Sequence, residues 1–328
     1  VVAPACYVLL PRTEATTPGK WAIGQALLLI AGMISVVYGI KAGFGGKQPV
    51  TTVIVVVAFG LAALTLFARK QLHSPEPMLD LSLLSHPAIV AGLIMAVVSS
   101  GALAGVELTL AQELQYVLSK TPLQAGVFMI PIMAAAAVAG PVAGYLSNWF
   151  GLRLVATLSL AISAIALVGL ARSDFHEPGI LVPFALAVLG LTLSIALTAS
   201  SIAIMGSVDA SKGGAAGSLE ATGYELGTGL GISLFGVFTS AVFSRAIELP
   251  SHLAQDLAEQ ASRTIGDTYI VAGLIAGEQG AALIEAGKVA FTQAHAVLLM
   301  TAAGVIAMLA VVVFFTLAGY RNSSRVPH

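Results

Sequence analysis

The chain has 328 residues, of which 57% are hydrophobic and only 9% are charged, with a mean hydropathy of +0.94. Soluble domains carry roughly 25% charged residues, so this composition excludes an ordinary soluble domain. A formal net charge of −1 leaves no basic excess for binding a nucleic-acid backbone, and the single Cys6 excludes an internal disulfide.

Apolar runs along the chain predict an all-α polytopic membrane protein. A helix needs about 20 predominantly apolar residues to cross the hydrocarbon core, because its backbone groups must all be bonded internally there. We predict eight such spans, at residues 21–43, 51–68, 87–115, 122–146, 152–171, 179–205, 213–244 and 291–319. Val1 to Leu10 resembles the end of another span, so we expect the chain to be a piece of a larger protein.

The distribution of basic residues predicts the orientation of the spans, because short cytoplasmic loops are enriched in Lys and Arg. Eight of the 15 basic residues fall on one side, in residues 11–20, 69–86, 320–328 and two short turns. The other side has four in short loops and three in one long connection. This bias predicts a cytoplasmic linker at 11–20, a cytoplasmic loop at 69–86 and a cytoplasmic C-terminal tail at 320–328.

Carboxylates inside predicted spans are candidate functional residues, because an unpartnered charge there costs several kcal/mol. Glu107 lies midway along the third span, and Glu113 follows Gln112 near its exterior end. Glu220 and Glu225 both lie in the seventh span, about 140° apart around a helix, so that one can line a cavity while the other packs against a neighbouring helix.

A carboxylate that alternately holds a proton and an organic cation exchanges one for the other, because both compete for the same charge. We therefore predict that Glu107, Glu113, Glu220 and Glu225 couple protons or bind substrate, with Tyr224 as a hydrogen-bonding or cation–π partner. The alternative for each carboxylate is a hydrogen bond to a neighbouring helix that serves packing alone.

Glycine and proline mark two spans for special backbone behaviour. Pro131 and Pro141 should kink the fourth span, because proline removes a hydrogen-bond donor from the helix. Gly223, Gly227 and Gly231 form two GxxxG steps in the seventh span, which predict close packing against another helix. The alternative interpretation of the seventh span is a moving gate, because a helix with so few large side chains is weakly fixed by its neighbours.

The long connection at residues 245–290 is acidic and is predicted to lie outside the cell. Its second half mixes small apolar residues with charges, which favours a hairpin lying against the membrane surface. Two interpretations of this connection are possible: a passive spacer, or a cap over an exit vestibule.

Enzyme chemistry is not indicated. The sequence has no GxSxG, HExxH or P-loop motif, and neither a metal site nor a cofactor is predicted. His73, His86 and His295 are interpreted as interfacial residues rather than ligands.

Two stretches resemble the fourteen-span drug:proton antiporters of the major facilitator superfamily. The first runs from Gln112 to Gly126 and continues through Pro131, Gly140, Pro141, Gly144 and Gly151. The second is the glycine-rich run from Gly213 to Gly231, which contains Glu220, Tyr224 and Glu225 and is most similar to methyl viologen and quaternary-ammonium exporters. Pro75 to Leu81 also resembles the family's loop into its ninth span.

The resemblance implies that the chain holds spans seven to fourteen of such a protein in a bacterial cytoplasmic (inner) membrane. Residues 21–68 would be an accessory helix pair, and residues 87–319 a C-terminal six-helix bundle. The partner of this bundle would be the N-terminal six-helix bundle of the same protein. The family's conserved cytoplasmic loop matches Gly144 to Gly151, but Asn148 and Trp149 replace its charged pair. The glycine turn and Arg153 are kept, whereas an ion-pair latch is in doubt.

These observations lead to three hypotheses. The first is proton-coupled export of lipophilic or quaternary cations, with the proton as coupling ion and the lipid bilayer as surroundings. The second keeps the fold but exports a specific metabolite, with the carboxylates as proton relays. The third is a membrane sensor or scaffold that uses the acidic exterior loop as its binding surface.

Overall fold

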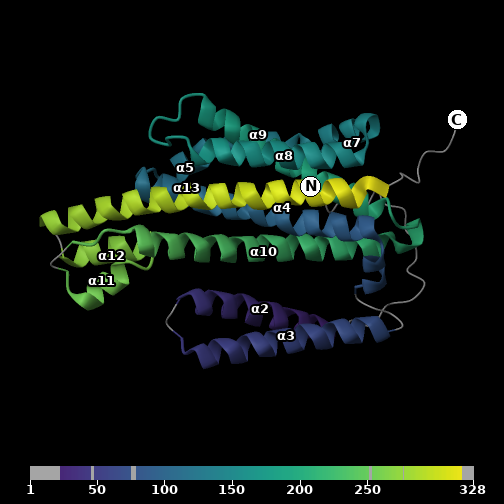
Figure 1. Ribbon diagram of the computed structural model, residues 1–328, viewed down its shortest axis with the longest axis horizontal. Helices are drawn as coiled ribbons and strands as arrows, with labels where there is room; N and C mark the ends of the chain where they lie inside the picture. The colour runs from purple at the N-terminus through teal and green to yellow at the C-terminus, as the bar shows by residue number, and fades with distance from the viewer. Residues whose placement is uncertain (1–22, 46–47, 75–78, 251–252, 276, 320–328) are drawn as a thin grey trace, which may run out of the picture.

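A computed structural model describes residues 23–45, 48–74, 79–250, 253–275 and 277–319 (Figure 1). The predicted helix end at 1–10, the linker at 11–20 and the tail at 320–328 lie outside the described residues. Within these ranges the chain is almost entirely helical and forms no strand.

Among the described residues, seven helices are long and apolar enough to cross a membrane. They are α2 (Ile23–Gly45), α3 (Val50–His73), α4 (Pro87–Gln112), α8 (Leu152–Ala171), α9 (Leu181–Met205), α10 (Gly213–Ala246) and α13 (Gly277–Thr316). Counting one bent helix pair as a span brings the described part of the chain to eight. The predicted all-α, polytopic fold class is therefore confirmed.

The bent span consists of two short helices, α6 (Ile130–Ala137) and α7 (Ala139–Phe150), and follows directly on a third, α5 (Pro122–Phe128). The axes of α6 and α7 differ by 48°. Pro131 lies at the start of α6 and Pro141 in the first turn of α7. Because neither proline has an N–H to donate to the preceding turn, the hydrogen-bond ladder is interrupted next to both breaks.

The last span differs from its predicted extent. The helix α13 begins at Gly277 rather than near residue 291 and runs for 40 residues, which gives a length of about 60 Å. The short helix α12 (Ile265–Ile275) packs beside its first turns, and α11 (Gln255–Ala261) packs against α12. Residues 277–290, expected in a hairpin on the membrane surface, are thus continuous with the last span.

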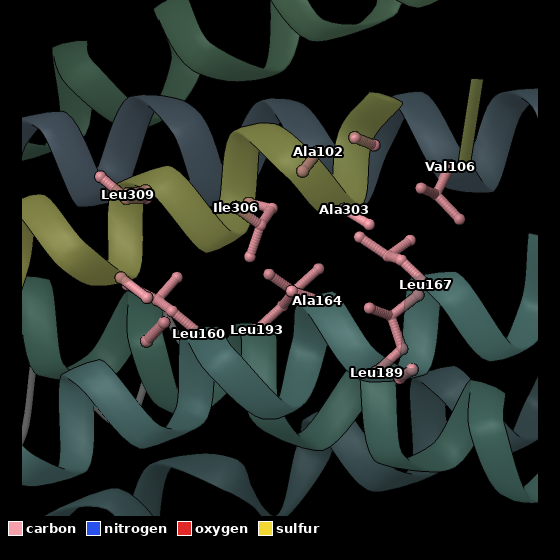
Figure 2. Close-up of a cluster of buried hydrophobic side chains, with 14 of the residues drawn as sticks. Ala102, Val106, Leu160, Ala164, Leu167, Leu189, Leu193, Ala303, Ile306 and Leu309 are labelled. Atoms are coloured by element: carbon pink, nitrogen blue, oxygen red, sulfur yellow. The ribbon is translucent and has the colours of Figure 1, made fainter. Parts of the chain in front are cut away.

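The core of the bundle lies between α4, α8, α9 and α13. Leu160 and Leu167 of α8 meet Leu189 and Leu193 of α9, with Ile306 of α13 opposite them (Figure 2). Alanines at Ala102, Ala164 and Ala303 allow the helices to approach one another. In lipid this contact stabilises the bundle through van der Waals packing rather than through removal of apolar surface from water.

The helices α2 and α3 pack against each other and lie beside α10, at one side of the bundle (Figure 1). The side chain of Gln71 near the end of α3 donates to Oε1 of Gln25 at 2.8 Å and accepts from the N–H of Leu79 at 3.0 Å. This buried amide joins both helices to the chain just before η1 (Leu81–Ser85) and α4.

The helices α4 and α10 are in direct backbone contact. Gly223, Gly227 and Gly231 face α4, where their neighbours are Leu93, Val97 and Gly101. Since residues in the same order meet along both helices, the two run in the same direction. A methyl group on Gly101 would lie 2.8 Å from the carbonyl oxygen of Gly227, and one on Gly231 would overlap the backbone of Gly101.

Replacing Gly231 by alanine should therefore destabilise the protein, by about 1–3 kcal/mol as for other overpacked sites. Gly229 is the matched control, because it lies on the same helix with open space around it. Gly229→Ala should be neutral or stabilising by up to about 1 kcal/mol, since alanine favours helix. Thermal unfolding in detergent measures both, and equal effects of the two variants would contradict the backbone contact.

Candidate functional site

Three of the predicted site residues lie on α4 and α10 within electrostatic range of one another. Glu107 of α4 is half-buried, Tyr224 of α10 is 40% exposed and Glu225 is exposed. The phenol of Tyr224 interacts electrostatically with both carboxylates. The hydroxyl of Ser100, seven residues before Glu107 on α4, donates to the backbone carbonyl of Tyr224 at 3.0 Å and joins the two helices at the level of Tyr224. Two carboxylates and an aromatic ring thus form a loose group on these two helices.

Glu220 and Gln112 do not join this group. Glu220 is half-buried in the second turn of α10, and Gln112 is half-buried at the end of α4. In the described part of the chain, neither side chain makes a hydrogen bond or an ion pair.

Glu113 is the most deeply buried of the four predicted carboxylates. It begins a single π-helical turn, Glu113–Val117, at the end of α4 and is 1% exposed. The hydroxyl of Thr292 on α13 donates to its Oε1 at 2.7 Å. Nδ1 of His295, one turn further along α13, lies 3.6 Å from its Oε2. Glu113 therefore lies inside the bundle, not at its surface.

His295 corrects the sequence interpretation of an isolated interfacial residue. It is 2% exposed, with its ring 5.6 Å from that of Phe175 and 6.4 Å from that of Phe291. A signal that could have found it is the placement of Thr292 and His295 three residues apart on one face of α13. Their partner on α4 could not be identified from helix periodicity alone.

The turn between α7 and α8 carries the predicted motif residues. Gly151 joins the two helices with φ 83°, a conformation that favours glycine. Asn148 and Trp149 are exposed, and Gly144 has open space around it. Among the described residues no ion pair forms at this turn.

Arg153, just after this turn, binds the end of α13. Its Nε donates to the carbonyl of Phe314 at 2.8 Å, and its guanidinium lies 3.8 Å from the centre of the Phe314 ring. A cation at the carbonyl end of a helix also interacts favourably with the helix dipole. Arg153 therefore ties α8 to α13 at the end opposite Glu113.

Asp80 and Lys212 connect the starts of α4 and α10. Nζ of Lys212 lies 3.8 Å from Oδ2 of Asp80. The hydroxyl and then the N–H of Ser82 donate to Oδ1 of Asp80 at 2.5 and 3.1 Å and hold the pKa of this carboxyl below its ordinary value. The two helices that carry Glu107 and Tyr224 are thus linked at this end by charge as well.

Two cavities lie next to these helices, and both are lined by apolar groups. One of about 820 Å³ runs between α8 and α13, and one of about 380 Å³ lies among α4, α10 and α13. Neither cavity is lined by a predicted carboxylate. No group of three His, Cys, Asp or Glu side chains suited to a metal ion occurs in the described ranges.

The sequence of this chain is similar to those of bacterial resistance and efflux proteins. The chain is 39% identical over 310 residues to the methyl viologen resistance protein SmvA of Salmonella typhimurium, covering 94% of this chain and 62% of that protein. It is 26% identical over 286 residues to the multidrug efflux pump LfrA of Mycolicibacterium smegmatis, covering 86% and 56%. The chain thus spans less than two thirds of the length of these relatives. No protein-family model matches it.

A solved structure has the same fold. It is a bacterial homolog of the human lysosomal transporter Spinster, in an inward-facing and occupied conformation, with a TM-score of 0.53 and 16% sequence identity. The match covers 89% of this chain and 68% of that one. The chain is accordingly a multi-pass membrane protein with a helical bundle of the major facilitator type.

The Gly144–Gly151 motif offers a direct test of its turn. Gly151→Ala should cost about 1–3 kcal/mol of stability, because a residue with a Cβ atom is strained at this positive φ. Gly144→Ala, in the same motif but with open space around it, should have little effect. Thermal unfolding of the two variants checks this expectation, and a harmless Gly151→Ala would contradict the geometry of the turn.

Proposed function

We propose that this chain is the C-terminal part of a major facilitator drug exporter, which moves lipophilic cations out across the bacterial cytoplasmic membrane in exchange for protons. The observation that carries this proposal is the group of Glu107, Tyr224 and Glu225 on α4 and α10. The names of the relatives support it, because methyl viologen is an organic cation and because LfrA is described as a multidrug efflux pump.

The group of three residues has the chemistry that cation–proton exchange requires. The carboxylate of Glu107 is half-buried, so a proton or a cation bound there is attracted more strongly than in bulk water. The two ligands compete for one negative charge, and release of one accompanies binding of the other. The ring of Tyr224 adds a flat surface for a cation, which such rings attract by about 0.5–2 kcal/mol.

Inward movement of protons supplies the work of export. Each charge that crosses a potential of 100 mV releases about 2.3 kcal/mol. No nucleotide, metal or other cofactor belongs to the proposal. The orientation proposed from the basic residues places the C-terminus in the cytoplasm, and Glu113 and the α11–α12 pair near the exterior.

The intact exporter would need a second bundle. The N-terminal six helices of the same protein would then cover one face of this chain. That face includes the exposed side chains of Tyr224 and Glu225 and the half-buried Glu107. The pair α2–α3 would lie between the two bundles as an accessory unit. Substrate would bind between the bundles, with this chain supplying one wall.

We expect Glu107→Gln in the full-length protein to reduce proton-driven efflux of a fluorescent organic cation by about tenfold or more, the scale of a lost proton-transfer group. The measurement is efflux into inverted membrane vesicles, with and without a proton gradient. Glu278→Gln is the matched control, because Glu278 is exposed in the first turn of α13, and it should transport normally.

Glu220→Gln is measured in the same experiment, because Glu220 is the other carboxylate predicted to couple protons. Gradient-driven movement that is absent in the wild type, or unchanged in both Glu107→Gln and Glu220→Gln, would overturn the carboxylate mechanism. Movement of one specific metabolite without movement of organic cations would favour the alternative exporter.

A further inference from the structure

A buried acid–base pair lies at the exterior end of the bundle, apart from the Glu107 group. Glu113 and His295 are 1% and 2% exposed, and Oε2 of Glu113 lies 3.6 Å from Nδ1 of His295. They come from α4 and α13, helices that are far apart in the sequence and pack against each other. The ring of Phe175 stacks on the imidazole, and the ring of Phe291 lies tilted beside it. The pair therefore lies in a buried, partly aromatic environment.

Each partner has a polar atom that nothing satisfies. Oε2 of Glu113 and Nε2 of His295 are buried and make no hydrogen bond with the described residues. A pair that served packing alone would be expected to have its hydrogen bonds filled, since buried polar groups almost always are. At 3.6 Å, Nδ1 of His295 and Oε2 of Glu113 are just beyond hydrogen-bonding distance.

Several charged side chains on the surrounding elements have other partners. Lys288, two turns before His295, pairs with Glu285 at 2.7 Å, and Asp174 in the α8–α9 connection pairs with His176. In the π turn, the carbonyl of Tyr116 accepts from the hydroxyl of Tyr269, and Lys120 lies over the ring of Phe128. In the described part of the chain, His295 is the only basic side chain within 4.0 Å of Glu113.

We propose that Glu113 and His295 form a proton-binding site that receives its proton from the exterior side. A proton arriving at Nε2 of His295 makes an imidazolium, and transfer of the Nδ1 proton to Oε2 of Glu113 restores a neutral imidazole beside a neutral carboxylic acid. The pair gains one proton in total: the Nε2–H and Oε2–H bonds form, and the Nδ1–H bond breaks. The hydroxyl of Thr292 holds the carboxyl in place through Oε1.

The cost of burying charge explains why the site would hold a proton. An ionised Glu113 beside a neutral imidazole is a net negative charge with one hydroxyl donor, and such a charge is expensive to bury. One added proton makes the pair neutral. The π turn at Glu113–Val117 is itself a feature found frequently at functional sites, because it changes where the helix aims its side chains.

The role of this site in coupling rests on the proposed function, whereas its proton binding does not. In the proposed exporter the pair would take protons from outside and pass them toward Glu107, which is six positions earlier on the same helix. Proton binding is therefore measured first and separately from transport.

Infrared difference spectra of the detergent-solubilised full-length protein, recorded across the neutral pH range, test proton binding. We expect a protonated-carboxyl band that Glu113→Gln removes and that the exposed control Glu278→Gln leaves in place. Thr292→Val keeps the carboxyl and should shift the frequency of the band, because it removes the donor to Oε1. A wild-type spectrum without such a band, or a band unchanged in both Glu113→Gln and Thr292→Val, would overturn the site.

Transport measured in proteoliposomes then tests coupling. Glu113→Gln and His295→Gln should each reduce proton-driven accumulation of an organic cation by about tenfold, while exchange of labelled for unlabelled cation without a gradient continues. The double variant should be no worse than the single variants, because both remove one site. Loss of exchange together with accumulation would assign the pair to structure alone. A wild-type protein that binds the proton but moves no cation would contradict the proposed function and leave the proton site standing.

Discussion

The backbone contact between α4 and α10 is the constraint on which the rest of the candidate site depends. Gly101 and Gly231 let the two helices touch without side chains between them. Because the helices run in the same direction, Asp80 and Lys212 meet at their starts, and Glu107 and Tyr224 come within electrostatic reach further along. A larger residue at either glycine would separate the groups that the proposed exchange of ligands requires.

Hydropathy was sufficient to predict most of the fold, because a membrane allows few ways to satisfy a backbone. The spans at α4, α8, α9 and α10 lie close to their predicted ranges, and the two prolines lie at the breaks of the bent span. The extent of α13 was not predictable in this way. Its first turns contain Glu278, Glu285 and Lys288, and α12 packs against these turns as a neighbour that hydropathy does not reveal.

The candidate site was predicted in part. The cost of an intramembrane charge singled out Glu107 and Glu113 from one sequence, since that cost does not depend on knowing the neighbours. Partners are a different matter, because they come from other helices. The pairing of Glu113 with His295 and Thr292 depends on how α13 is rotated toward α4, and that rotation is set by packing across the whole bundle. The same limit applies to Glu220, whose interior position brought it no partner among the described residues.

The two carboxylates of α4 place opposite demands on one helix. Glu107 must reach an open face where substrate can arrive, whereas Glu113 is enclosed by α13 and aromatic rings. Six residues correspond to about 9 Å of rise along an α-helix, too far for direct proton transfer between the carboxyl groups. In the proposed exporter a proton that passes between them therefore needs a carrier between the two carboxyl groups. The π turn that begins at Glu113 is the point where the α-helical register of this helix changes, beyond the glycine contact with α10 at Gly101.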